Sequence, residues 1–279
     1  MISLNLLPAP LLAATAALFG ACIGSFLNVV VWRLPRQESV VVPGSHCPRC
    51  GTTLAWYDNI PVLSWLLLRG RCRHCQAGIS ARYPLVELLC AGLFVAMLLA
   101  QPSGLGPAPL PALLLLCGWL LAAWLIPLSL IDLDSQWLPE PLCRWGMLVG
   151  LLITTGLGLL QSPDLARTLL LEHLIAAAAG LLGFEATSLL AQRLLGRPAL
   201  GLGDAKLAAL LGAWLGPLGL GLAVAVAVIL GGAFGAAGLL SGRLKRQQAV
   251  PFGPFLAIGA LAIWIGGHAP WLALLGLAS

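Results

Sequence analysis

Two aspartates stand at the ends of otherwise apolar stretches of this sequence. Asp132 directly follows one apolar run, and Asp204 closes the segment Gly201-Leu202-Gly203-Asp204. A carboxylate at membrane depth costs roughly 2.5–3.5 kcal/mol on insertion scales, so such a residue is expected to have a function. Two carboxyl groups that meet cannot both ionise, so one keeps its proton while the other activates water. This pairing predicts the chemistry of aspartic proteolysis.

A third aspartate, Asp134, is a rival to Asp132 for this role. Residues two apart on a helix point about 200° away from each other, so only one of the two can face a given partner. Gly201 and Gly203 allow other backbone to approach Asp204 closely. The spacing leaves a structural alternative open, in which these carboxylates face the cytoplasm at helix ends and Asp204 is an N-cap.

Four cysteines form two CxxC pairs, Cys47-Pro48-Arg49-Cys50 and Cys72-Arg73-His74-Cys75, which are separated by residues 51–71. This spacing predicts a tetrahedral four-thiolate zinc site of the ribbon kind. His46 and His74 adjoin the pairs and could substitute as ligands, but the four cysteines already fill the shell. Disulfides or redox-active dithiols are the alternatives. A reducing cytoplasm disfavours structural disulfides, and no βαβ pattern surrounds either pair. Because four thiolates fill the coordination shell, the zinc is expected to be structural.

Composition indicates an all-α polytopic membrane protein. Of the 279 residues, 59% are hydrophobic and 9% are charged, whereas ordinary soluble domains contain about 25% charged residues. A spanning helix needs about 20 apolar residues. About eight such stretches are predicted, at 9–32, 84–100, 110–131, 143–160, 172–194, 205–217, 219–240 and 252–277. The sixth is short, and a tight turn near Pro217 joins it to the seventh. Three parts follow: the first helix in 1–32, a small zinc loop module in 33–83 and a peptidase bundle in 84–279.

The basic residues define an orientation in the membrane. With eight spans, all of the 15 Lys and Arg residues except Arg167 lie on one face. The positive-inside rule makes this face cytoplasmic and places both termini outside. Asp132, Asp204 and the zinc loop then lie on the cytoplasmic side. Aromatic and aliphatic residues in 54–68 suit the membrane interface, where lipid is the expected partner, and do not favour nucleic acid.

Taken together, these residues resemble the type IV prepilin peptidases of the GxGD intramembrane aspartyl protease group. Both cysteine pairs carry the resemblance, as do Gly24 to Val30, Arg33 to Pro35, Trp56 to Trp65, Arg69 to Cys72, Ile79 to Glu87, Ile131 to Asp134, Leu138-Pro139, Gly201 to Leu207 and Gly212 to Gly216. The sequence departs from the family at Glu140, where Asp or Asn usually follows Leu-Pro. Glu140 is more plausible as a local helix cap than as a catalytic group.

The resemblance implies two activities in the bacterial inner membrane. Members of the family remove the basic leader of type IV prepilins and type II secretion pseudopilins at the cytoplasmic face. They then methylate the new terminal amine with S-adenosylmethionine. The resemblance assigns the catalytic pair to Asp132 and Asp204. No GxGxxG motif follows a strand, so the donor-binding residues are unassigned, and the roles of Glu87 and Glu185 stay open.

Other classes of protein fit parts of the pattern. A peptidase without methyltransferase activity is one alternative, and a non-enzymatic scaffold organised by the zinc loop is another. A transporter would use the intramembrane carboxylates to relay protons or bind cations. It would predict inverted repeats, and the cysteine loop has no counterpart in the second half of the chain.

Overall fold

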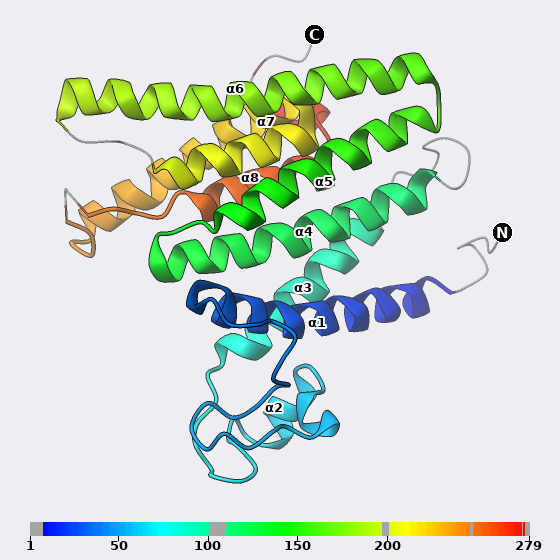
Figure 1. Cartoon of the computed structure of the whole chain (residues 1–279), viewed down its shortest axis with the longest axis vertical. Helices are drawn as coiled ribbons and strands as arrows, with labels where there is room; N and C mark the ends of the chain where they lie inside the picture. The colour runs from blue at the N-terminus through cyan, green and yellow to red at the C-terminus, as the bar shows by residue number, and fades with distance from the viewer. Residues whose placement is uncertain (1–7, 101–109, 197–200, 246–247, 275, 277–279) are drawn as a thin grey trace. The chain divides into compact units, whose positions relative to one another are not determined.

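The computed structural model describes residues 8–100, 110–196, 201–245, 248–274 and 276 (Figure 1). These residues form helices and loops, and the β structure among them is limited to two isolated bridges. This confirms the predicted all-α class. Both chain termini, and Arg197 and Arg246 from the predicted cytoplasmic face, lie outside the described residues. The chain packs into two units, Met1–Ala123 and Trp124–Ser279, and the predicted division at 32/33 and 83/84 stays a prediction.

Two long helices and the cysteine loop make up most of the first unit. Its elements are α1 (Ala9–Arg33), η2 (Leu34–Arg36), η3 (Trp56–Asn59), α2 (Leu63–Leu67), α3 (Arg82–Leu99) and the first part of α4 (Leu110–Ser135). Gly20 and Gly24 lie one turn apart on α1. A Cβ on Gly20 would lie 2.7 Å from the Cys90 carbonyl oxygen, and one on Gly24 would lie 2.8 Å from the Glu87 Cα. The two glycines therefore let α1 and α3 approach backbone to backbone, the packing that membrane helices favour.

Helices that run side by side form the second unit (Figure 1). They are the end of α4, α5 (Glu140–Leu159), α6 (Pro163–Leu195), α7 (Leu202–Leu240), α8 (Gly253–Gly266) and α9 (Ala269–Leu274). Close contact again depends on glycine. A Cβ on Gly180 would lie 2.7 Å from the Ala208 carbonyl oxygen, and one on Gly212 would lie 2.5 Å from that of Ala176. This close packing against α6 fixes the position of the first half of α7, which carries Asp204 near its start.

Helix α7 is broken at Gly216. Its 39 residues would extend about 58 Å as one straight helix, nearly twice the hydrocarbon thickness of about 30 Å. Gly216 adopts φ 67° and ψ −175°, and Pro217 follows it. Because Pro217 has no N–H, the Ala213 carbonyl lacks its usual helical donor, and the buried ring of His173 contacts that oxygen instead, with Nδ1 at 2.9 Å. The predicted boundary between the sixth and seventh spans falls at this break.

Six of the described helices are long and apolar enough to cross a membrane. They are Ala9–Arg36, Arg82–Leu99, Leu110–Ser135, Glu140–Leu159, Pro163–Leu194 and Leu202–Leu240. The predicted single span 252–277 is divided instead into α8, of 14 residues, and α9, of six. Gly267, with φ 68° and ψ −173°, ends α8 in a backbone conformation that residues with a side chain rarely adopt. The total of eight spans stays a prediction.

Candidate active site and metal centre

Asp132 is buried near the end of α4, with 5% of its surface exposed. The N–H of Gly253 donates to its Oδ2 at 3.0 Å. Gly253 is the first residue of α8, so the carboxylate lies at the positive end of a helix dipole. Asp134, two residues further along α4, is exposed, as the rotation of about 200° between the two requires.

Gly253 is a site residue that sequence reasoning missed. A Cβ at this position would lie 2.7 Å from Oδ2 of Asp132, so the backbone reaches the carboxylate only because the side chain is absent. The local signal is Phe252-Gly253-Pro254 before an apolar run, since proline favours the first turn of a helix. That signal locates the start of α8 but gives no indication of its partner, 121 residues earlier.

Asp204 lies in the first turn of α7 and is partly buried. Its Oδ2 accepts the N–H of Gly201 at 3.1 Å. The N-cap is Gly201, so Asp204 is not itself the N-cap, although it satisfies an N-terminal N–H from the third helical position. A Cβ on Gly203 would lie 3.0 Å from Cβ of Leu138. Gly203 thus lets the start of α7 pack against the residues that follow α4.

The structure brings Asp132 and Asp204 within electrostatic reach of each other. Each carboxylate is oriented by one backbone N–H at the start of a helix. Such a pair can share a proton and orient a water molecule. The N-cap of α5 is Pro139, and Glu140 is the first helical residue instead of the predicted cap. Glu140 forms an ion pair with Arg144 at 3.8 Å, one turn along the same helix. Glu185 lies partly buried on α6.

The four predicted metal ligands come together in the first unit. The sulfur atoms of Cys47, Cys50, Cys72 and Cys75 all lie within 4.8 Å of one another. Those of Cys47 and Cys75 are 3.8 Å apart, and this is about the edge of a tetrahedron whose zinc–sulfur distances are near 2.3 Å. No disulfide forms among the described cysteines. The cluster can therefore bind a metal ion.

Each cysteine pair lies in the same backbone turn, repeated 25 positions along the chain. The matching bonds are Gly51 N to Cys47 O (2.9 Å) with Gln76 N to Cys72 O (3.0 Å), and Cys47 N to Thr52 O (3.0 Å) with Cys72 N to Ala77 O (2.9 Å). The bridges His46–Thr53 and Arg71–Gly78 close the two turns. We call 46–53 and 71–78 the two knuckles.

Local hydrogen bonds favour the thiolate form of two of the ligands. The backbone N–H groups of Cys75 and His74 hold the pKa of the Cys72 thiol below its ordinary value. The hydroxyl of Thr52, with its backbone N–H, lowers the pKa of Cys50 to about 6. Thiolate is the form that binds metal.

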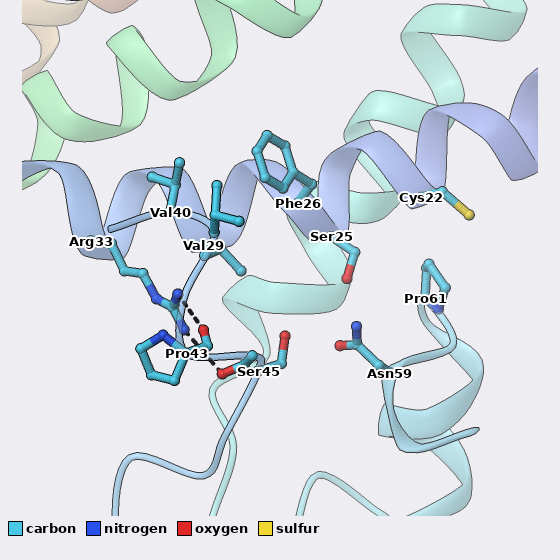
Figure 2. Close-up of a pocket in the computed structure, with 12 residues that line it drawn as sticks. Cys22, Ser25, Phe26, Val29, Arg33, Val40, Pro43, Ser45, Asn59 and Pro61 are labelled. Atoms are coloured by element: carbon cyan, nitrogen blue, oxygen red, sulfur yellow. Dashed lines mark hydrogen bonds between the residues drawn. The ribbon is translucent and has the colours of Figure 1, made fainter. Parts of the chain in front are cut away.

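Two arginines stabilise the loop around the knuckles, one through hydrogen bonds to carbonyls and the other through an ion pair. Arg33 is 5% exposed and donates to the carbonyls of Ser39 at 3.0 Å, Pro43 at 2.7 Å and Gly44 at 3.2 Å; the bonds to residues 43 and 44 appear in Figure 2. Arg73 binds the Asp58 carboxylate through Nε at 3.0 Å and Nη2 at 2.6 Å. This guanidinium holds the pKa of Asp58 below its usual range.

The fold and the site define a class: polytopic helical membrane proteins with two carboxylates, each accepting an N–H from the start of a helix, and a four-cysteine cluster in a loop. Residues 18–101 match the bacterial peptidase A24 N-terminal domain, and residues 119–236 match the type IV leader peptidase family. The chain belongs to the type IV leader peptidase family.

Three curated relatives show the extent of the similarity. A prepilin leader peptidase/N-methyltransferase of Myxococcus xanthus is 46% identical over 206 residues, which cover 74% of this chain and 57% of the relative. A type 4 prepilin-like proteins leader peptide-processing enzyme of Escherichia coli is 38% identical, over 88% of this chain and 91% of the relative. A prepilin leader peptidase/N-methyltransferase of Burkholderia pseudomallei is 36% identical, over 97% and 90%. No solved structure matches the chain.

Proposed function

We propose that this protein removes the leader from prepilins and pseudopilins with Asp132 and Asp204, and then methylates the new terminal amine with S-adenosylmethionine as donor. The peptidase and methyltransferase activities are those of its family. The observation that supports the residue assignment is the proximity of the two carboxylates, each fixed by a backbone N–H. Exposed Asp134 lacks the burial of Asp132, which favours Asp132 for the first role.

Peptide hydrolysis by this pair is general acid–base catalysis. One carboxylate takes a proton from water as the water attacks the scissile carbonyl, and the other carboxyl donates a proton to the leaving amine. One backbone amide orients each of the two carboxylates. Gly203 and Gly253 allow this arrangement, since each leaves room for a neighbouring side chain.

The residues present fit a structural zinc ion. Four cysteine sulfurs at tetrahedral spacing form a closed shell, whereas a catalytic zinc keeps an open position. In zinc-finger peptides the metal contributes roughly 10–16 kcal/mol of apparent binding energy. A loop with few regular elements gains its order from such a contribution.

The proposed orientation places both aspartates and the zinc loop on the cytoplasmic side of the inner membrane and both termini in the periplasm. The distribution of Lys and Arg supports it. A prepilin presents the junction between its basic leader and its apolar helix at this face, where water is available for hydrolysis.

The test uses purified protein in detergent with a prepilin and S-adenosylmethionine, and the products are identified by intact mass. Asp132→Asn and Asp204→Asn are each expected to reduce leader removal by about 10²–10⁴-fold or more, because each loses a proton-transfer group. Asp134→Asn is the matched control and is expected to retain cleavage. A peptide supplied without its leader is expected to be methylated by all three variants. Full cleavage by Asp204→Asn, or loss of cleavage in Asp134→Asn alone, contradicts the assignment.

A further inference from the structure

A cavity of about 490 Å³ lies in the first unit, lined by the end of α1, the start of α3 and the cysteine loop. A smaller cavity of about 310 Å³ adjoins it (Figure 2). The two share five lining residues: Ser25, Val29, Arg33, Ser45 and Asn59. The larger volume lies within the range of about 300–1,000 Å³ that small-molecule sites occupy. The proposed peptidase chemistry at Asp132 and Asp204 uses neither cavity.

Glu87 is a buried charged residue in the lining of the larger cavity. It is 7% exposed, and its Oε2 accepts the Val62 N–H at 2.7 Å. The Ser25 hydroxyl, which lines the same cavity, is its second polar neighbour. Both partners are neutral, and among the described residues Glu87 forms no ion pair. A buried carboxylate without a cation is costly, so a cationic ligand would offset that cost.

The other charged groups of the lining are engaged or lie at the surface. Arg33 donates to three carbonyls, and Asp58 is bound by Arg73. Glu38 and Arg49 are exposed. Glu87 is therefore the lining group best placed to bind a positive charge within the cavity.

Neutral polar groups converge on the wall that the two cavities share. Figure 2 shows the side chains of Ser25, Ser45 and Asn59 pointing toward one another from three segments of the chain. In the described residues, neither the Ser45 hydroxyl nor the Asn59 amide is hydrogen-bonded to another protein group. Asn28 donates Nδ2 to the Tyr83 carbonyl at 3.1 Å, which leaves its amide oxygen as an acceptor. These groups suit the hydroxyl and amino groups of a nucleoside.

An apolar wall completes the cavity. The Trp65 ring is fixed by its Nε1–H, which donates to the Ile79 carbonyl at 3.0 Å. Ile60, Val62 and Leu68 line the same space. A fixed aromatic ring among aliphatic side chains provides a surface for a planar heterocycle, and specific sites combine such apolar walls with a few polar groups.

We propose that this cavity binds the methyl donor, and that Glu87 faces the donor's positive charge. The inference rests on the methyl transfer in the proposed function. S-adenosylmethionine is a cationic nucleoside, and the cavity combines one buried carboxylate, neutral polar groups and an apolar wall. When bound, the donor supplies a methyl group to the amine nitrogen, and the broken carbon–sulfur bond leaves its electron pair on sulfur. Glu87 and the shared polar wall bind and orient the donor.

The first test is calorimetric titration of the full-length protein in detergent with S-adenosylmethionine and, separately, with uncharged adenosine. Glu87→Gln keeps the size of the side chain and an oxygen for the Val62 N–H. We expect it to weaken binding of S-adenosylmethionine at least tenfold and to change adenosine binding little. Glu172→Gln, an exposed glutamate of α6, is the matched control with wild-type affinities. Equal weakening of both ligands, or wild-type affinity in Glu87→Gln, overturns the proposal.

A second variant tests the space rather than the charge. Asn59→Trp places a large ring at the shared wall, and we expect it to abolish binding of both ligands. Zinc content and leader cleavage, measured in every sample, identify a variant that has not folded. They also separate the proposals. Absent cleavage in the wild type counts against the peptidase, absent donor binding in the wild type counts against the methyl transfer, and wild-type donor binding that the Glu87→Gln and Asn59→Trp variants leave unchanged counts against the cavity alone. Retained donor binding in Asn59→Trp rules out the donor site.

Discussion

Asp132 and Asp204 each accept a backbone N–H from a glycine, and at Asp132 the missing side chain of that glycine is what allows the contact. Gly253 donates to one carboxylate and Gly201 donates to the other. Helix N-termini also favour negative charge through their dipoles. At this scale the acidic residues were predictable, because a carboxylate beside an apolar run is conspicuous. Gly253 was not, since its role depends on a contact between residues far apart in sequence.

Gly253→Ala tests this dependence on glycine. The added Cβ would lie 2.7 Å from Oδ2 of Asp132, so the carboxylate or the start of α8 must move. A displacement of about 1 Å costs about 10²-fold in rate, and we expect leader removal to fall by about that factor, measured by initial rates. Gly235→Ala is the control, because its Cβ would meet no atom within 4 Å. Equal rates in Gly253→Ala and the wild type would show that the contact is not needed.

Among the elements, α7 and the cysteine loop depart most from regular structure. Hydropathy predicted two spans where α7 lies, and the structure shows a break at Gly216 with the Ala213 carbonyl bonded to His173. The sequence indicated the break because Pro217 cannot continue the hydrogen-bond ladder. It did not indicate that His173 satisfies the free carbonyl, since that contact joins two helices.

Gly216→Ala is expected to lower the free energy of unfolding by about 1–3 kcal/mol, because φ 67° strains a residue with a side chain. The Cβ would also lie 3.3 Å from Nε2 of His173. The thermal midpoint of the detergent-solubilised protein measures the change. Gly221→Ala, on the same helix with no atom within 4 Å of the added Cβ, is expected to leave the midpoint unchanged or raise it. Similar midpoints for the two variants would argue against strain at Gly216.

The metal site gives a separate prediction for the loop. Cys72→Ser is expected to abolish stoichiometric zinc, measured by elemental analysis, and to expose the segment between α1 and α3 to proteases, because one lost thiolate opens the coordination shell. Cys22→Ser, which lies on α1 outside the cluster, should keep both the metal and the protection. Zinc retained by Cys72→Ser would remove that cysteine from the ligand set.

For the molecule as a whole, composition was the most informative part of the sequence. Mean charge and hydropathy predicted the all-α membrane class, and the ordered motifs identified the family, because both depend on patterns local to the chain. The division of the last predicted span at Gly267 and the cavity beside Glu87 were not predictable in this way. A glycine within an apolar run can either pack or terminate a helix, and a cavity is formed by residues that sequence reasoning cannot bring together.

The orientation is testable with fusions to alkaline phosphatase, which is active only outside the cytoplasm. A fusion after Ser279 is expected to be active, and a fusion after Arg243 is expected to be inactive, since the positive-inside rule assigns these positions to opposite faces. A green fluorescent protein at the same two positions is the complementary control, with the reverse pattern. Equal phosphatase activity at both positions would contradict the predicted span 252–277 between them, and with it the total of eight.

The two knuckles have the same backbone but different side chains between their cysteines. Pro48 and Arg49 occupy those positions in one, and Arg73 and His74 occupy them in the other. Main-chain hydrogen bonds define both turns, so the side chains between the cysteines are free to form contacts with other parts of the protein without changing the metal site. In the second knuckle, Arg73 binds the carboxylate of Asp58. A designer who wished to attach this loop to a new neighbour would begin at Pro48, which occupies the position equivalent to Arg73 in the first knuckle.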